Sequence, residues 1–471
     1  MKRSSFKIVA LVSLPILLAS CGAMRKYDAP KLTEAQQQKL YRDANASDST
    51  NLADLNWKDI FTDPQLQALI EEALNNNYDL RNAILQIAIT EASFKQSKLA
   101  LLPNLNFAPQ VTHNKTSRAA LNFPPSVNIN LKTTTVQLGF SSNWELDVWG
   151  KLASGRRAAQ ANWLQADASK RAVQTSLIAN IANMYYNLLA LDKQLSVTEE
   201  TLKLRIATVQ TLQALKDAAI INGAGVVQGE ANRYAAEVTI PDIKQSIREL
   251  ENAMSVLLGR PMQAADRATL ETSSIDATLA VGVPVQLLTK RPDVQAAELG
   301  FRKAFENTNV AKAQFYPSFT ITSANAGISA LTTKNLFSES IFYNFIGGLT
   351  QPIFNKGAIR ANHKIAVAQQ EQAWNTFEKT VLIAGQEVSN AMYAYQAAAE
   401  KQVSRTKQIA ALEKAVNFNM QLLEYSSATN YTDVLTAEQS LLTAKLAGVN
   451  DKLQQQKALI ELYRSLGGGW Q

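Results

Sequence analysis

The 471-residue sequence predicts an α+β membrane protein in which one unit of helices and strands occurs twice. The stretch 222–230 (NGAGVVQGE) returns as 430–438 (NYTDVLTAE), inside a gapless register of 45 residues that starts at Leu215 and Leu423. Apolar residues at seven-residue steps indicate long helices packed as coiled coils. Two pairs of short segments rich in Thr, Val and aromatic residues indicate strands. Each repeat is therefore expected to hold long helices and two strands.

The first 20 residues are predicted to be a lipoprotein signal peptide. A basic start precedes the apolar run 8–18, whose length of about 11 residues is well short of the ~20 that a membrane-spanning helix needs. Leu-Ala-Ser then leads to Cys21, the only cysteine, so no disulfide can form within the chain. We expect a covalent lipid on Cys21 and a lipidated tether over 21–56, and Gly22 suits transport to the outer membrane. The alternative is a plain leader with an incidental cysteine.

Several function classes are excluded by the composition. The formal net charge of +7 includes three basic residues of the leader, and the remaining +4 is spread without a basic cluster, so no nucleic-acid partner is expected. The two histidines, His113 and His363, lie far apart, and no Gly-rich phosphate loop, paired-histidine helix or nucleophile turn occurs. We therefore expect no enzyme, no cofactor-binding or metal site, and no catalytic residue.

The first repeat is expected over 57–260, in the order helix, two strands, long helix, short helix. Helical apolar spacing begins near Pro64, which suits a first helical turn, and continues to Pro103. Strands are expected near 104–112 and 133–148, because both segments have strand composition and flank a polar loop.

The long helices are predicted from segments that lack proline and that repeat apolar residues every seven positions. Between Gly150 and about Ile221 the chain has no proline and one further glycine, which predicts a helix of roughly 70 residues. Its seam residues lie seven apart: Leu188, Leu195, Leu202 and Val209. The second repeat has the same step at Val381, Val388, Tyr395, Ile409, Val416 and Leu423, broken only at Gln402. Such heptads predict left-handed supercoiling against neighbouring helices.

A linker at 261–283 separates the first repeat from the second, which is expected over 284–468 in the same order of elements. Its strands are expected near 317–329 and 342–354, with aromatic residues toward their ends. Segments of about 10 to 13 residues can cross a bilayer as tilted strands, and terminal aromatic residues suit the membrane interface. A pair of soluble hairpins, with an ordinary soluble coiled coil, is the alternative.

Closure of the strands limits how they could enter a membrane. Unpaired backbone groups in lipid cost several kcal/mol each, so a membrane sheet has no open edge, and single-chain barrels begin at about eight strands. Four strands cannot close by themselves. The simplest symmetric solution is a homotrimer whose three chains share twelve strands.

Four motifs, spread in order over 57–468, carry a resemblance to a known family. They are WKDIFTDP at 57–64; WELDVWGK at 144–151; RPDV at 291–294 with Ala297-Glu298 and AKAQFYPSF at 311–319; and GLTQPIF at 348–354 with Gly357 and Arg360. In this order and spacing the chain resembles the TolC-like outer-membrane efflux channels, and most closely their lipoprotein branch, which serves tripartite resistance-nodulation-division type pumps. The RPD tripeptide is also typical of a helix start.

The resemblance implies a fold and a function. The fold would be a trimeric 12-stranded outer-membrane β-barrel, four strands per chain, continued by a long α-helical coiled-coil tunnel in the periplasm. The chain would be lipid-anchored in the outer membrane and would passively conduct drugs, toxic compounds or metal ions. Its implied partners are a periplasmic adaptor protein, an inner-membrane efflux pump and outer-membrane lipid. A type I protein secretion channel and a non-conducting envelope scaffold remain alternatives.

The same resemblance places a periplasmic aperture at the repeated turns. The candidate residues are Asn222, Gly223, Gly225, Asn430, Tyr431, Thr432, Asp433, Thr436 and Gln439. Many family members narrow the pore with an Asp and an Arg where this chain has Thr436 and Gln439, and they have a Gly in place of Ser427. We therefore expect narrowing by polar residues and by Asp433 with Asn430; alternatively, Asp433 is solvated or caps its helix. Gly225 corresponds to Asp433 in the repeat, so the two turns need not be equivalent.

Overall fold

The computed structural model describes residues 24–30, 55–120, 124, 127, 130–273, 275, 290–331, 340–425 and 430–470. The predicted signal peptide, Cys21 and Ser427 lie outside these residues. The chain forms two compact units, and each unit combines segments of both repeats. Unit 1 comprises Met1–Pro30, Ile87–Gln165 and Ala297–Thr376, and unit 2 comprises Lys31–Gln86, Ala166–Ala296 and Phe377–Gln471.

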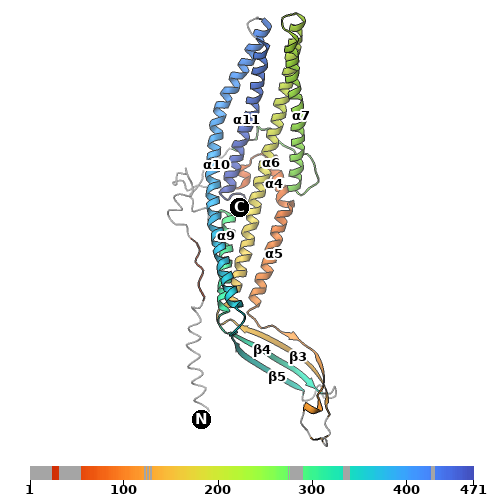
Figure 1. Cartoon of the computed structure of the whole chain (residues 1–471), viewed down its shortest axis with the longest axis vertical. Coiled ribbons are helices and arrows are strands. Elements are labelled where there is room, and N and C mark those ends of the chain that lie inside the picture. Colours follow the sequence, from red (N-terminus) through yellow and green to blue (C-terminus); the bar gives the residue numbers. More distant parts are fainter. Residues whose placement is uncertain are drawn as a thin grey trace. The chain divides into compact units, whose positions relative to one another are not determined.

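Unit 1 contains a five-stranded antiparallel sheet (Figure 1). Its order is β1 (Asn106–Phe107), β3 (Lys132–Leu146), β4 (Ser318–Ala330) and β5 (Ile341–Thr350), and β2 (Gln110–Lys115) also pairs with β3. Because β3 comes from the first repeat and β4 from the second, the sheet joins the two repeats. Gly139 lies opposite Gly327. A Cβ atom on Gly327 would be 2.2 Å from the backbone oxygen of Leu138, so this close approach of β3 and β4 requires glycine.

The segment predicted as one strand near 104–112 is divided in the structure. β1 ends at Phe107 and β2 begins at Gln110. Pro109 lies between them and has no N–H to donate to the ladder of hydrogen bonds. The neighbouring Ala108 N–H still donates to the carbonyl oxygen of Gly139 at 3.0 Å, so both short strands stay on the same side of β3.

The junctions between strands and helices are built from the motif residues. Asp147 accepts hydrogen bonds from the backbone N–H groups of Leu152 and Ala153, at 2.8 and 2.7 Å, in the first turn of the long helix that follows β3. Trp149 stacks on Tyr316 with ring centroids 4.9 Å apart. Its indole N–H donates to the carbonyl oxygen of Pro317 at 2.7 Å. These contacts join the end of β3 to the start of β4 within unit 1.

Beside the sheet, the described residues form four long helices and several shorter ones (Figure 1). The longest, α6 (Lys151–Asp217) and α10 (Ala358–Tyr425), have 67 and 68 residues, close to the expected length of the first. They are followed by α7 (Gly223–Leu257) and α11 (Tyr431–Ser465), of 35 residues each. The other helices are α3 (Trp57–Ile60), α4 (Pro64–Asn76), α5 (Tyr78–Leu99), α9 (Pro292–Ala313) and the short 3-10 helix η3 (Arg118–Ala120). α9 begins at Pro292, which confirms the helix start predicted from the RPD tripeptide.

One break within the first predicted helix was not expected from the sequence. α4 ends before Asn77, whose side-chain oxygen accepts from the N–H of Leu80 at 2.9 Å and so caps α5. The side-chain amide of Asn77 donates to the carbonyl oxygen of Leu257 at 2.9 Å. Asn77 therefore ends one helix, starts the next and holds the end of α7.

The core of unit 2 shows that the two repeats are not equivalent. Tyr185 is fully buried, and its hydroxyl donates to Asp63, the N-cap of α4, at 2.6 Å. Tyr393 follows Tyr185 at the same spacing as Asn430 follows Asn222, so it is the counterpart of Tyr185 in the second repeat, and it is 67% exposed. Burial of Tyr185 on α6 and exposure of Tyr393 on α10 show that the two long helices have different surroundings at this matched position.

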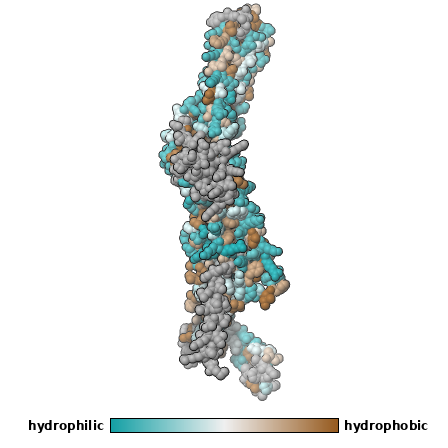
Figure 2. Space-filling view, turned by 90° about the vertical axis from the view of Figure 1, so that its left-hand side faces the viewer, coloured by the Kyte–Doolittle hydropathy of each residue, from teal (hydrophilic) through white to brown (hydrophobic). Residues whose placement is uncertain are grey.

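The helical surface is mixed in character. On the face that Figure 2 shows, hydrophobic surface occurs in several places among hydrophilic surface. Exposed apolar side chains include Ile89 on α5 and Leu382, Val403 and Phe418 on α10. Among the described residues, no helix is both long and apolar enough to cross a membrane.

Candidate functional site: the paired helical turns

The two repeated turns have matching caps in unit 2. Asn222 precedes α7, and its side-chain oxygen accepts from the N–H of Ala224 at 3.1 Å. Asn430 precedes α11, and its side-chain oxygen accepts from the N–H of Thr432 at 3.3 Å. Because an asparagine in this position satisfies a free N–H of the first helical turn, both residues have a structural role that the repeat preserves.

The turn of the first repeat also contains a strained residue. Ala219 has a φ of 58°, in the left-handed region that favours glycine. The N–H of Ala219 donates to the carbonyl oxygen of Lys216 at 2.9 Å, and the N–H of Ile220 donates to that of Leu215 at 2.9 Å. These bonds end α6 before α7 starts. Alanine rarely adopts this conformation, so no sequence pattern indicated it.

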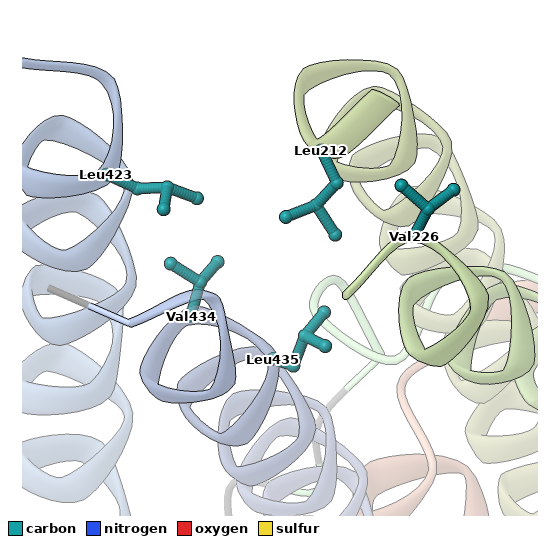
Figure 3. Close-up of a cluster of buried hydrophobic side chains, with 5 residues drawn as sticks. All are labelled: Leu212, Val226, Leu423, Val434 and Leu435. Carbon is teal, nitrogen blue, oxygen red and sulfur yellow. The ribbon is translucent and has the colours of Figure 1, made fainter. Parts of the chain in front are cut away.

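The two turns pack against each other through an apolar cluster. Side chains from all four helices meet there, and those of Leu212 on α6 and Val434 on α11 are fully buried. Figure 3 shows the members pointing toward one another: Leu212, Val226, Leu423, Val434 and Leu435. Gly225 also belongs to this contact, because a Cβ atom on it would lie 3.2 Å from the ring of Tyr431. The absence of a side chain at Gly225 therefore lets the ring of Tyr431 approach α7.

A buried polar cluster lies next to the apolar one. The guanidinium of Arg205 on α6 donates to the carbonyl oxygen of Asn232 on α7, and it donates to the side-chain oxygen of Gln439 on α11 at 2.7 Å. The hydroxyl of Thr208 donates to Glu438 at 2.5 Å. Arg205 and Glu438 are each only 2% exposed. The bonds to Gln439 and Glu438 connect the helical hairpin α6–α7 to the helical hairpin α10–α11.

Burial sets the electrostatics of this cluster. Loss of water raises the pKa of the Glu438 carboxyl above its usual range, although the hydrogen bond from Thr208 and the charge of Arg205 oppose the rise. Loss of water also lowers the pKa of Arg205, against the opposing charge of Glu438. One oxygen of Glu438 and Nε of Arg205 have no hydrogen-bond partner among the described residues. The cluster is therefore only partly satisfied, which makes its energy sensitive to small changes.

The predicted aperture residues divide into packed and exposed ones. Gly225 is buried and Tyr431 half-buried, whereas Gly223 is exposed and has no atom within 4 Å of the place that a Cβ atom would take. Asn222 and Asn430 are the caps already described. Thr432, Asp433, Thr436 and Gln439 are exposed. All nine lie in unit 2, at or near the two turns, and their placement around a pore stays a prediction.

Asp433 has a clear local role. It lies in the first turn of α11, where a carboxylate is favoured by the positive end of the helix dipole. Its N–H donates to the carbonyl oxygen of Asn430 at 2.9 Å, and its own carbonyl oxygen accepts from the side chain of Asn419 at 3.3 Å. Its exposed carboxylate leaves both interpretations from the sequence open, narrowing of a pore and a solvated or capping residue at the helix start.

Sequence reasoning missed Arg205, Thr208 and Glu438. Two signals could have found them. Arg205 stands three residues after the seam residue Leu202, where a heptad normally places a second apolar residue. Glu438 ends the repeated stretch, so a carboxylate recurs there in both copies. A polar residue at an apolar seam position indicates a polar partner on a neighbouring helix.

The described part of the chain contains no group of three or more His, Cys, Asp or Glu residues able to hold an ion. The two histidines have other contacts. His113 on β2 shares a hydrogen bond of 2.8 Å with Thr134 on β3, and His363 packs edge-on against Phe315.

Solved structures define the class of this fold. The chain is similar to the outer-membrane channel OprN, with a TM-score of 0.85 and 25% identity over 95% of this chain and 99% of that one. It is also similar to the open state of the MtrE outer membrane channel of Neisseria gonorrhoeae, with a TM-score of 0.83 and 27% identity over 95% of this chain and 98% of that one. The described elements therefore have the α+β fold of outer-membrane channels.

The family follows from the sequence comparisons. The model of the outer membrane efflux protein family matches residues 69–260 and 283–468, and the chain belongs to this family. It is 29% identical to the cation efflux system protein CusC of Escherichia coli O6:H1, over 97% of each chain. It is 28% identical to the probable outer membrane lipoprotein SilC of Salmonella typhimurium, over 99% of each. The predicted family resemblance is confirmed, and the chain is an outer-membrane component of an efflux system.

Proposed function

We propose that three copies of this chain form a passive duct, which carries small molecules from an inner-membrane pump and a periplasmic adaptor across the outer membrane. The observation that carries this proposal is the sheet of unit 1, whose apolar side chains are exposed in the single chain. Ile341, Tyr343 and Phe345 alternate along β5 and are 84%, 87% and 67% exposed. Alternate residues of a strand share one face, so these side chains form an apolar surface that suits contact with lipid.

The lengths and edges of the strands support a shared barrel. β3, β4 and β5 have 15, 13 and 10 residues, enough to cross a bilayer when tilted. Within the described residues β5 pairs only with β4, and β1 and β2 pair only with β3. Because open edges are unstable in lipid, pairing of these edges with neighbouring copies would satisfy the backbone, and three chains would close the sheet.

The cargo is proposed as a class only. Relatives of nearly equal similarity are named for different cargoes: the cation efflux protein CusC at 29% identity and the toluene efflux pump protein TtgC of Pseudomonas putida at 27%. A duct whose relatives serve different pumps does not itself select the cargo. We therefore propose small molecules as the class of cargo. We also propose that the pump and the adaptor select which small molecules are carried. These names support efflux over protein secretion or an envelope scaffold.

A lipid on Cys21 is part of the proposal. Support comes from the leader and its Leu-Ala-Ser-Cys sequence, and from the name of SilC as a probable outer membrane lipoprotein. Labelling of cells with radioactive palmitate would test it. The wild-type chain should be labelled, and Cys21→Ser should not; equal labelling of both chains would contradict the assignment.

Conductance tests the duct. The purified full-length chain should sediment as a trimer and should produce discrete current steps in planar bilayers. A trimer that never conducts, at any voltage and after Arg205→Met has loosened the turns, would contradict the duct and favour a scaffold. A conducting monomer or dimer would contradict the shared barrel.

A further inference from the structure

The segment that follows the proposed lipid anchor is held against α9 in unit 1. The hydroxyl of Tyr27 donates to the carboxylate of Glu298, and the Tyr27 ring meets that of Phe305 edge-on with centroids 5.6 Å apart. The side-chain amide of Asn309, itself 3% exposed, donates to the carbonyl oxygen of Arg25 at 3.0 Å. Glu298 belongs to the central family motif, and this contact gives it a role that the motif alone did not explain.

This docked segment forms one wall of a cavity of about 520 Å³. A second wall is the stretch 147–150, which connects β3 to α6, and a third is α9. Trp149 lies on the second wall and is the same residue that stacks on Tyr316. A cavity of this size is large enough for a phosphate-bearing headgroup.

The cavity has an excess of positive charge. It is lined by four cationic side chains and two carboxylates. Both carboxylates are already engaged: Asp147 accepts from the first turn of α6, and Glu306 accepts from Arg157 at 2.7 Å. The remaining cationic side chains are Arg25, Lys26 and Arg302.

These three side chains have no ion pair within the described part of the chain. The guanidinium of Arg302 lies over the Tyr27 ring, 5.4 Å from its centroid, and its buried Nε has no hydrogen-bond partner among the described residues. Arg25 and Lys26 are exposed. Three unpaired cations around one cavity favour an anionic ligand.

The position of the cavity suggests the source of the anion. If the strands cross the outer membrane, the junction of β3 and α6 lies at the membrane surface, where aromatic residues such as Trp149 and Tyr316 are typical. Arg25 is four residues from Cys21, so an anchored lipid would lie within roughly 14 Å of it along the chain. Both relations place the cations at the level of lipid phosphates.

We propose that this cavity binds the phosphate group of an anionic phospholipid in the periplasmic leaflet of the outer membrane, beside the protein's own lipid anchor. The proposal rests on the proposed function, because it requires the strands to be in the membrane. It assigns Arg25, Lys26 and Arg302 as phosphate-binding residues and Tyr27 as the residue that positions the first two.

Native mass spectrometry of the purified, assembled full-length chain tests this site. The chain is titrated with phosphatidylglycerol or with phosphatidylcholine, with and without millimolar inorganic phosphate. We expect phosphatidylglycerol to bind more strongly than phosphatidylcholine. Its affinity should be about ten-fold lower in Arg25→Gln/Lys26→Gln, because each basic residue near a lipid surface raises the affinity roughly five-fold before screening by salt. Arg302→Gln keeps the sequence of the segment after Cys21, although it removes the contact with the Tyr27 ring, and it should also weaken binding.

The control is Lys401→Gln/Lys407→Gln, which removes two exposed charges of α10 in unit 2 and should leave phosphatidylglycerol binding unchanged. Equal binding of the two lipids, or equal losses in the control and test variants, would overturn the site. Displacement by inorganic phosphate at millimolar concentration would overturn the lipid as the ligand and assign free phosphate. Conductance of the same variants keeps the outcomes separate, because an intact channel without lipid preference contradicts only this inference.

Discussion

The guanidinium of Arg205 on α6 and the side-chain oxygen of Gln439 on α11 lie 2.7 Å apart, joined by a hydrogen bond between the two helical hairpins. The family resemblance implies an arginine that narrows the pore at the position where this chain has Gln439. In the structure the arginine instead comes from α6, and the carboxylate whose charge acts on it is that of Glu438, next to Gln439. Buried Arg205 thus links the hairpin α6–α7 to the hairpin α10–α11 through a polar contact.

Replacing Arg205 should loosen this link. Arg205→Met removes both hydrogen bonds of the guanidinium and the charge that acts on buried Glu438. A hydrogen bond made by a charged group contributes about 1.5–3 kcal/mol to folding stability. We expect a lower unfolding temperature, faster hydrogen exchange near the two turns, and a larger mean conductance.

Arg205→Met combined with Glu438→Gln is the matched variant, because it also removes the unpaired carboxylate. It should recover part of the lost stability, since a neutral pair is less costly to bury. If the single and double variants unfold at the same temperature, Glu438 is not the cause of the destabilisation.

Much of the fold could be predicted from the sequence, because its signals are local. The long helices lack proline and repeat apolar residues every seven positions, and α6 begins one residue after Gly150. The break at Asn77 and the left-handed Ala219 depend on tertiary contacts or on rare backbone conformations, so propensity could not reveal them. Of the candidate site, the repeat located both turns and named Asn222 and Asn430 as aperture candidates, but it did not reveal that they cap their helices. It could not reveal that Arg205 crosses to α11, because the partner of a buried cation is fixed only by the packing of distant helices.

The packing of Gly225 against Tyr431 can be tested with a pair of glycine substitutions. Gly225→Val places side-chain atoms where the ring of Tyr431 lies, because even a Cβ atom would be 3.2 Å from it. Overpacking of this kind should cost about 1–3 kcal/mol of stability. The measurement is thermal unfolding of the purified chain, followed by conductance.

Gly223→Val is the control for this substitution. It adds the same side chain two residues away, where no atom lies within 4 Å. Its effect on stability should be below about 1 kcal/mol, because only helix propensity changes. Equal destabilisation by the two valines would mean that contact with Tyr431 is not what limits position 225.

Burial of Glu438 should make stability depend on pH. Its pKa is raised in the folded chain above the ordinary value of 4.5, chiefly by loss of water. As pH rises from 4.5 through the folded pKa, the unfolded chain releases this proton before the folded chain does, so folding stability should fall across that window.

Glu438→Gln should remove this part of the pH dependence. Thermal unfolding between about pH 4 and pH 8 measures it, as the difference between wild type and variant at each pH. Glu230→Gln is the matched variant, because it makes the same change at the half-buried counterpart in the first repeat. A difference between wild type and Glu438→Gln that does not change with pH would show that folding does not raise the pKa of this carboxyl.

Asp433 decides whether the turns form a cation-attracting ring. Its carboxylate is exposed at the start of α11, and three copies around an axis would concentrate negative charge there. Asp433→Asn should then lower cation preference and reduce conductance on the order of two-fold at low salt, with a smaller effect at about 1 M salt because the charges are screened. Asp242→Asn removes an exposed carboxylate from α7, away from the turn, and should change neither property. Unchanged current and selectivity in Asp433→Asn would instead assign the carboxylate to the helix dipole alone, and unfolding of that variant should then show a loss of about 0.5 kcal/mol.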